Sequence, residues 1–163
     1  MNVRLLEPAD AEAFRELRLE ALTLHPTNFL TTAAEFAKRT LEDHRGALSR
    51  GKSWGLFDGD RLNGMGALLP MTFAAAAHRA EIGAVYVRKA QQGTGAADAL
   101  MHGLVQAAVS YGVWQLELFV ADDNLRAQRF YARHGFREAG RLPNAALVGG
   151  VMTSDIFMVA DLR

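Results

Sequence analysis

Apolar and polar positions along the chain follow two different periods. Around residues 3–5 they alternate in twos, which predicts a short strand, and Asp10 can then cap a helix. Apolar residues recur on one face of that helix until His25-Pro26, which ends it. A second helix is predicted over about residues 33–48, where a weaker helical period continues.

From residue 54 onward, predicted strands alternate with predicted helices. The expected strands cover residues 54–57, 61–71, 81–88, 115–120, 136–142 and 151–162, and the expected helices cover residues 95–111 and 124–134. Asp58-Gly59-Asp60 is typical of a hairpin turn. Gly103 lies inside a helix, where it costs roughly 1 kcal/mol against alanine, and close packing on a sheet is the simplest reason. This mixed order predicts an α/β or α+β protein whose helices cover a sheet.

The composition is that of one ordinary globular domain. The 163 residues carry 18 Lys and Arg, 18 Asp and Glu and no cysteine, and we expect a single domain over residues 1–163. A formal net charge of zero gives no field for nucleic acid or a membrane surface, and no run approaches ~20 apolar residues. Because the N-terminus lacks a secretory signal and there is no disulfide framework, we expect a cytoplasmic protein. Five histidines without paired ligand spacing predict no metal site.

A glycine-rich turn joins the strand at residues 81–88 to the next helix. Gly93 and Gly95 let the backbone approach an anion closely, and the first amides of the helix have no partners within it. The alternative is a tight turn without a ligand. Asp98 stands where a dinucleotide fingerprint needs its third glycine, and no Gly-Lys-Ser/Thr follows, so neither dinucleotide nor triphosphate binding is favoured.

The helix at residues 124–134 carries a second candidate group. Asn124, Ala127 and Tyr131 lie at positions i, i+3 and i+7 and share one helix face. The Asn124 amide can contact a ligand as well as cap the helix, Ala127 leaves room, and Tyr131 offers a phenol to the same groove. The alternative is an ordinary amphipathic helix with Tyr131 half-buried.

Taken together, the two groups carry a family resemblance that covers about residues 3–162. The matching positions are Gln92, Gly95 and Ala97 after Val85–Val87, and then Asn124, Ala127, Phe130, Tyr131, Gly135 and Phe136. This pattern resembles the donor motifs of the GNAT superfamily of acyl-CoA N-acyltransferases. The sequence departs from it at Lys89, where a proline is common, and at Gln92, where an arginine is more frequent.

The resemblance implies a fold and a cofactor. The fold would be a mixed, mostly antiparallel sheet of about six to seven strands, flanked by about four helices and splayed between the fourth and fifth strands. The cofactor would be acetyl-CoA, acting as co-substrate. The implied cofactor-binding residues are Val85, Tyr86 and Val87 along the pantetheine arm, Gln92, Gly93, Thr94, Gly95, Ala96 and Ala97 at the pyrophosphate, and Asn124, Ala127 and Tyr131 near the pantetheine and the thioester sulfur. Phe29, Phe36 and Phe73 would lie on the acceptor side.

The implied reaction is direct attack of a primary amine on the thioester, with Tyr131 as general acid and the Val87 amide as oxyanion donor. Glu81 is the first candidate base, because a two-residue period places it on the strand face of Val85 and Val87. The alternative for Glu81 is a structural residue at the edge of the sheet, either paired with Arg79 or solvated. Glu117, His78 and a water molecule are the other candidate bases.

We therefore expect an acetyl-CoA-dependent N-acetyltransferase, and the alternative is a non-catalytic acyl-CoA-binding sensor. The acceptor stays open among a small amine, an amino acid, an antibiotic amine, a peptide and a protein lysine. The acyl-chain preference is open as well. Analogy with the family suggests a homodimer through residues 151–162.

Overall fold

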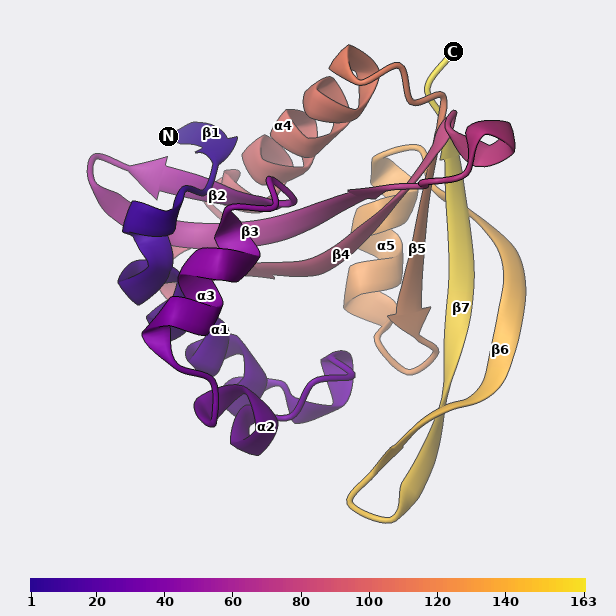
Figure 1. Cartoon of the computed structure of the whole chain (residues 1–163). Coiled ribbons are helices and arrows are strands. Elements are labelled where there is room, and N and C mark those ends of the chain that lie inside the picture. The colour runs from indigo at the N-terminus through magenta and orange to yellow at the C-terminus, as the bar shows by residue number, and fades with distance from the viewer. The chain divides into compact units, whose positions relative to one another are not determined.

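The computed structural model describes residues 1–163, which form seven strands and five α-helices. The strands are β1 (Asn2–Leu5), β2 (Ser53–Asp58), β3 (Arg61–Pro70), β4 (Arg79–Val87), β5 (Gln115–Ala121), β6 (Arg137–Val148) and β7 (Val151–Asp161), and the helices are α1 (Ala11–Leu24), α2 (Ala33–Ala37), α3 (Leu41–Leu48), α4 (Ala96–Ser110) and α5 (Leu125–Arg133). They can be followed in Figure 1. The sheet order is β1-β2-β3-β4-β5-β7-β6. Strand β2 pairs antiparallel with β1 and β3, and β7 pairs antiparallel with β5 and β6, whereas β4 and β5 are parallel. This mixed, mostly antiparallel sheet confirms the predicted fold class.

The chain divides into two compact units. The first unit comprises Met1–Leu68 and Ala84–Gln106, and the second comprises Leu69–Gly83 and Ala107–Arg163. Strand β4 and helix α4 each contribute residues to both units.

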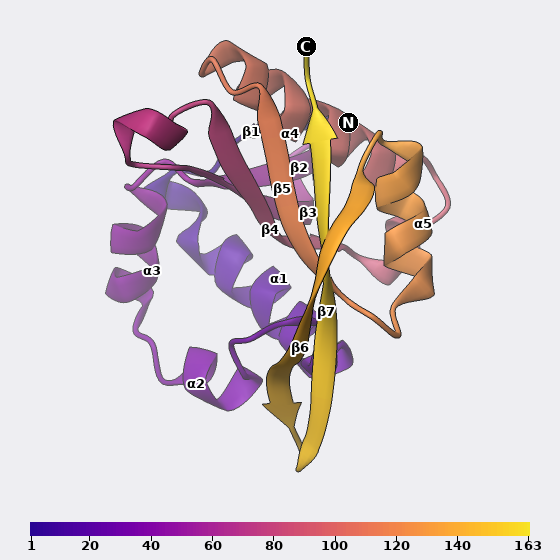
Figure 2. The same ribbon diagram turned by 90° about the vertical axis from the view of Figure 1, so that its right-hand side faces the viewer.

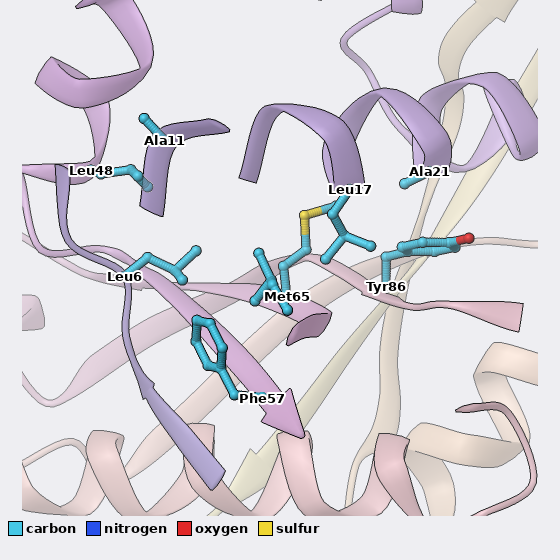
Figure 3. Packing of buried hydrophobic residues seen from close by; sticks show 9 residues of the cluster. Leu6, Ala11, Leu17, Ala21, Leu48, Phe57, Met65 and Tyr86 are labelled. Atoms are coloured by element: carbon cyan, nitrogen blue, oxygen red, sulfur yellow. The ribbon is translucent and has the colours of Figure 1, made fainter. Parts of the chain in front are cut away.

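In the first unit, helices α1 and α3 lie on one face of β1, β2 and β3, and α4 lies on the other (Figure 1). A cluster of buried side chains fills the space under α1, as Figure 3 shows for Leu17, Met65 and Phe57. Leu17, Ala21 and Leu22 of α1 are buried, so the predicted apolar face of this helix is confirmed. Burial of each large apolar side chain stabilises the fold by roughly 1.5–3 kcal/mol.

The predicted helix over residues 33–48 is wrong, because the structure has two helices there. Thr40 interrupts the helix: its backbone is extended, and its hydroxyl accepts a hydrogen bond from the Asp43 amide at 3.1 Å. The Asp43 carboxylate in turn accepts from the Thr40 amide at 2.7 Å. This reciprocal cap begins α3, and the Thr-x-x-Asp spacing is the sequence signal that could have revealed it.

Asp10 lies at the start of α1 but does not cap it as predicted. Its carboxylate accepts hydrogen bonds from the Arg4 guanidinium at 2.8 and 2.9 Å and from the Glu7 amide at 2.8 Å. The prediction of a helix start was right, but this carboxylate instead ties a short 3-10 turn, Pro8–Asp10, to β1.

Close packing explains Gly103, as the sequence suggested. A Cβ at this position of α4 would lie 2.4 Å from Cγ1 and 2.7 Å from Cβ of Val3 on β1. Such distances cannot be relieved by moving the end of a flexible side chain, so glycine lets the helix approach the strand.

The second unit is built on β5, β7 and β6, which form an antiparallel arrangement. The β6–β7 hairpin turns at Gly149-Gly150 and extends past the end of β5 (Figure 2). Strand β4 joins β5 in parallel over three residue pairs only, Arg79–Glu81 against Gln115–Glu117. Helix α5 is anchored by Gln128, whose amide donates to the carbonyl oxygens of Ala121 and Asp122 at 3.0 Å each. None of the helices combines the length and hydropathy needed to cross a bilayer.

Candidate functional site

The glycine loop of the first unit has the backbone conformation that the sequence predicts. Gly93 and Gly95 have φ values of +80° and +87°, and α4 begins directly afterwards at Ala96. A Cβ at either glycine would meet nothing within 4 Å. Glycine is therefore required here by the backbone conformation rather than by crowding.

The start of α4 supplies unpaired backbone amides. The Ala99 amide donates to the Gly95 carbonyl at 2.9 Å, which is the first hydrogen bond of the helix. The amides of Ala96 and Ala97 precede that bond and have no intrahelical acceptor. Together with the positive end of the helix dipole, they make a backbone site suited to an anion such as a pyrophosphate.

Gln92 links this loop to the end of β4. Its side-chain Nε2 donates to the Val87 carbonyl at 3.1 Å, and its backbone amide donates to the Lys89 carbonyl at 3.2 Å. The side chain thus holds the loop and the strand together. The groups that remain available to contact an anion are the backbone amides that follow Gln92.

At the end of β4, Tyr86 takes no side-chain part in the predicted cofactor site. Its ring is buried in the core under α1 (Figure 3), and its hydroxyl donates to Glu20 Oε1 at 2.8 Å. Burial, followed by the Glu20 carboxylate, raises the pKa of Tyr86 to about 12. Only the backbone of Tyr86 is available to a ligand, whereas Val85 is half-buried and Val87 is buried.

Ala84 breaks the regular alternation of β4. Its φ is +52°, in the left-handed region that costs a residue other than glycine roughly 1–2 kcal/mol. The two-residue period therefore does not extend from Glu81 to Val85 and Val87. Glu81 therefore cannot be assigned to the strand face of Val85 and Val87 from the period alone, because the period requires extended backbone throughout.

In the second unit, the first turn of α5 positions Asn124. Its Oδ1 accepts from the Ala127 amide at 3.1 Å, which leaves the side-chain NH2 available to a ligand. Ala127 and Tyr131 are half-buried on the same helix. The Tyr131 ring lies edge-on to Phe130 and Phe136, with centroids 5.4 and 5.8 Å away. Desolvation raises the pKa of Tyr131 to about 12, so the phenol keeps its proton at neutral pH.

Glu81 has no salt bridge to Arg79. Arg79 pairs instead with Glu117 through two guanidinium nitrogens, and its NH2 lies 2.8 Å from Glu117 Oε2. The Glu81 carboxylate makes neither a hydrogen bond nor an ion pair, and burial followed by the nearby Glu117 raises its pKa. A half-buried carboxyl with a raised pKa and no partner has the properties of a general base.

Glu117, the second candidate base, is buried and its carboxylate is engaged in hydrogen bonds, as is typical of a structural residue. It is 3% exposed, and Gln115 donates to it at 2.7 Å besides the two nitrogens of Arg79. The hydrogen bond from Arg79 is the main reason that the pKa of Glu117 lies below its ordinary value. The ring of His78, the third candidate, is tilted by 46° against that of Trp114, with the ring centroids 5.6 Å apart.

A pocket of about 210 Å³ in the first unit contains residues that the sequence analysis missed. Its lining comprises Phe14, Arg18, Thr31, Phe36, Arg39, His44, Ala47, Ser53, Met65, Gly66, Ala67 and Ala84. Phe36 was expected on the acceptor side, whereas Phe73 belongs to the second unit and is 79% exposed. The signal that could have revealed Arg18 is its helical spacing of four residues from both Phe14 and Leu22, in an apolar register. No group of three or more acidic or histidine side chains is arranged to hold a metal ion.

Comparison with known proteins assigns the family. The chain belongs to the acetyltransferase (GNAT) family, whose model matches residues 11–136. An uncharacterized N-acetyltransferase of Mycobacterium tuberculosis is 38% identical to it over 82 residues, which are 50% of this chain and 51% of that protein. The chain thus spans about half the length of the curated relatives it matches.

Solved structures share the fold. A ribosomal-protein-alanine N-acetyltransferase from Brucella melitensis has a TM-score of 0.85 at 21% identity, with 99% of this chain and 100% of that one covered. An acetyltransferase from Salmonella typhimurium, solved with its cofactor acetyl-CoA, has a TM-score of 0.82 at 21% identity, with 100% and 94% covered. At this level of identity, the likeness shows the fold alone.

Proposed function

We propose that this chain is an N-acetyltransferase that transfers an acetyl group from acetyl-CoA to a primary amine. The observation that carries the proposal is the pair of left-handed glycines that opens α4 after β4, in a chain whose residues 11–136 match the family. That loop presents backbone amides to an anion, which suits the pyrophosphate of coenzyme A. The proposal takes residues 1–163 as one catalytic domain, located in the cytoplasm and capable of forming a homodimer.

The donor would be held mainly by backbone groups. Val85, Tyr86 and Val87 offer main-chain partners to the pantetheine arm, in the manner of an added strand. The backbone of residues 92–97 receives the pyrophosphate, with Gln92 holding the loop to Val87. The NH2 group of Asn124 donates to a pantetheine carbonyl, and Ala127 leaves room for the arm.

The chemistry proceeds by direct attack, without an acyl-enzyme. The amine nitrogen attacks the thioester carbonyl carbon, and the Val87 amide stabilises the oxyanion. Glu81 takes the proton that the amine loses, and burial, which raises its pKa, makes this carboxylate a better proton acceptor than an exposed one. The carbon–sulfur bond then breaks, and Tyr131, which is protonated at neutral pH, gives its proton to the departing thiolate.

The first test separates donor binding from catalysis. Calorimetric titration of the purified chain should give micromolar binding of acetyl-CoA, with NADH silent. A thiol-release assay over a panel of amines should then give free coenzyme A. Binding without thiol release from any amine would identify a non-catalytic acyl-CoA sensor, and no binding near ~1 mM, about −4 kcal/mol, would reject the donor site.

The second test addresses the acid. Tyr131→Phe should lower kcat by about 10²-fold or more, in the range expected for a general acid, and leave the acetyl-CoA Kd nearly unchanged. Tyr111→Phe is the matched control, because that ring is 52% exposed after α4. An unchanged rate for Tyr131→Phe at every pH would remove Tyr131 from the mechanism.

A further inference from the structure

The pocket of the first unit is positively charged and has buried polar atoms without partners. Arg18 of α1 and Arg39, just beyond α2, both line it, and neither forms an ion pair. Nη1 of Arg18 is buried without a hydrogen-bond partner. A buried donor left unpaired is costly, so such a group in a native pocket calls for a ligand that pairs with it.

Aromatic rings fix the position of Arg18. Its guanidinium carbon Cζ lies 4.5 Å from the centroid of the Phe29 ring, which is a cation–π contact. Desolvation, followed by repulsion from Arg39, lowers the pKa of Arg18 to about 10, so it is still charged at neutral pH. A partly desolvated guanidinium is suited to bind a carboxylate through two parallel hydrogen bonds.

His44 adds a second unpartnered group. The residue is 1% exposed, its ring lies 4.6 Å from that of Phe36, and its Nε2 has no hydrogen-bond partner. Desolvation lowers the pKa of His44, with Arg15 and Arg39 as further causes, which favours the neutral imidazole. A neutral imidazole can donate one hydrogen bond from Nε2 to an oxygen of a ligand.

Glu35 and Asp43, two carboxylates whose pKa Arg39 helps to lower, are already engaged in other hydrogen bonds. Glu35 accepts from the amide and hydroxyl of Thr32, and Asp43 accepts from the amide and hydroxyl of Thr40. Both carboxylates serve as helix caps and are exposed. The charge of Arg18 therefore has no partner within the protein.

The geometry points to a carboxylate-bearing amine of amino-acid size as the acceptor, with its carboxylate bound by Arg18 and by Nε2 of His44. This inference rests on the proposed acetyltransferase function and narrows its substrate class. Ala84, which lines the pocket, directly precedes Val85, where the pantetheine arm is proposed to bind. An acceptor held in this pocket would thus lie beside the donor strand.

The size and lining of the pocket favour a small zwitterion over the other acceptors. A volume of about 210 Å³ lies below the usual range for drug-sized ligands, about 300–1,000 Å³. Phe14, Phe36 and Met65 provide apolar contact for a side chain. A protein lysine brings a cation and no carboxylate, and like charges repel it from the two arginines.

The test compares each amino acid with its own primary amide. L-alanine, L-methionine and L-phenylalanine are assayed beside the three amides by thiol release with saturating acetyl-CoA. The amides lack the negative charge but have amines that lose a proton more readily, so a preference for the acids cannot come from amine basicity. We expect at least about a tenfold higher kcat/KM for the best acid than for its amide, the effect of one lost hydrogen bond to a charged group.

Charge variants assign that preference to the pocket. Arg18→Gln should bring the acid-to-amide ratio close to one, and Arg18→Lys should restore part of it. Arg39→Gln, at an exposed position, should lower the ratio less. Arg45→Gln is the matched control, because Arg45 is an exposed α3 cation outside the pocket, paired with Glu42. The inference is overturned if the acid-to-amide ratio of kcat/KM is near one in the wild type. It is also overturned if Arg18→Gln leaves that ratio unchanged.

Two further readouts separate this inference from the proposed function. Calorimetry with acetyl-CoA tests the donor site alone, and each variant should bind it as wild type does. Side-chain NMR signals of Arg18 and His44 should shift on addition of the acids and not of the amides, whether or not transfer occurs. Loss of acetyl-CoA binding with these shifts retained would reject the function but support the pocket. Absent shifts, or shifts without acetylation of any acid by a protein that binds acetyl-CoA, would reject the acceptor assignment.

Discussion

Glu81 and Glu117 occupy paired positions on neighbouring parallel strands, yet their carboxyl groups have opposite surroundings. Arg79 and Gln115 hydrogen-bond Glu117 and lower its pKa, whereas Glu81 has no partner and its pKa is raised by burial and by Glu117. The hydrogen bond from Arg79 is thus the main reason that the pKa of Glu117 is lowered while that of Glu81 is raised. The sequence offered both glutamates as bases and could not assign Arg79, because the choice between two carboxylates depends on side-chain geometry.

Replacing Glu81 should change stability and catalysis in opposite directions. A carboxyl whose pKa is raised on folding contributes most stability below its unfolded pKa, near 4.5, and loses it as pH rises through the folded value. Glu81→Gln should therefore be at least as stable as wild type at pH 8, with the difference vanishing near pH 4, while kcat falls by about 10²–10⁴-fold. Urea unfolding at both pH values and thiol release check this.

The control for that change is Glu138→Gln, at an exposed position of β6. It should alter neither the pH dependence of stability nor kcat. A wild-type kcat in Glu81→Gln would mean that water or another group accepts the proton.

Removing Arg79 should expose the dependence of Glu117 on its partner. Arg79→Met leaves a 3% exposed carboxylate with Gln115 alone, which should cost about 1–3 kcal/mol at pH 7. Because the folded pKa of Glu117 is lowered, its stabilisation is present above about pH 4.5 and is lost as pH falls through the folded value. The variant's deficit should thus shrink toward pH 4. Unfolding curves for Arg126→Met, an exposed arginine of α5, give the baseline, and an equal deficit there would contradict the argument.

At the scale of elements, long periodic segments could be predicted and short caps could not. The strands and helices of the donor region were expected nearly where they lie, because glycines and a clear period define them. The break between α2 and α3 depends on the capping hydrogen bonds of one residue, Thr40. A single capping side chain does not change the hydrophobic period, so the period could not predict this break. The left-handed backbone at Ala84 left no trace in the sequence either, since alanine is common in extended and helical structure alike.

Two helix glycines should respond oppositely to alanine. Gly103→Ala gains about 1 kcal/mol of helix propensity but forces a Cβ to 2.4 Å from Val3, an overpacking that costs roughly 1–3 kcal/mol. We expect a net loss of up to about 2 kcal/mol in denaturant unfolding. Gly46→Ala in α3, where a Cβ meets nothing within 4 Å, should gain about 0.5–1 kcal/mol. Stabilisation by both substitutions would mean that β1 and α4 can move apart at no cost.

At the scale of the whole molecule, the sequence identifies the family and the glycine loop but not the pocket of the first unit. The donor motif is contiguous, so a short string of residues reveals it. The pocket draws Arg18, Arg39, His44 and Ala84 from separate elements, and only the folded chain brings them together. The proposed class of acceptor therefore depends on the folded chain, in which the two residues with unpartnered buried nitrogens, Arg18 and His44, line the same pocket.

Acetyl-CoA should stabilise the folded chain by mass action. At a concentration of 100 Kd, the ligand adds about 2.7 kcal/mol, which for a chain of this length raises Tm by roughly 5–10 °C. Gly95→Ala should lower the Tm of the free protein and remove most of the rise in Tm that acetyl-CoA causes. Gly112 also has a positive φ and open space around it, so Gly112→Ala should lower the Tm of the free protein but retain the rise with acetyl-CoA. Thermal melts with NADH as a second ligand control check this, and an equal shift in both variants would place the cofactor elsewhere.

The backbone at Ala84 restricts how this pocket can diversify. A wall residue with φ near +52° tolerates glycine, asparagine or aspartate, but it strongly disfavours branched or bulky side chains. An evolving or engineered descendant therefore has few ways to reshape the cavity from this strand. New acceptor preferences would have to arise from the helices α1 and α3, which makes their facing positions the place to direct a mutant library.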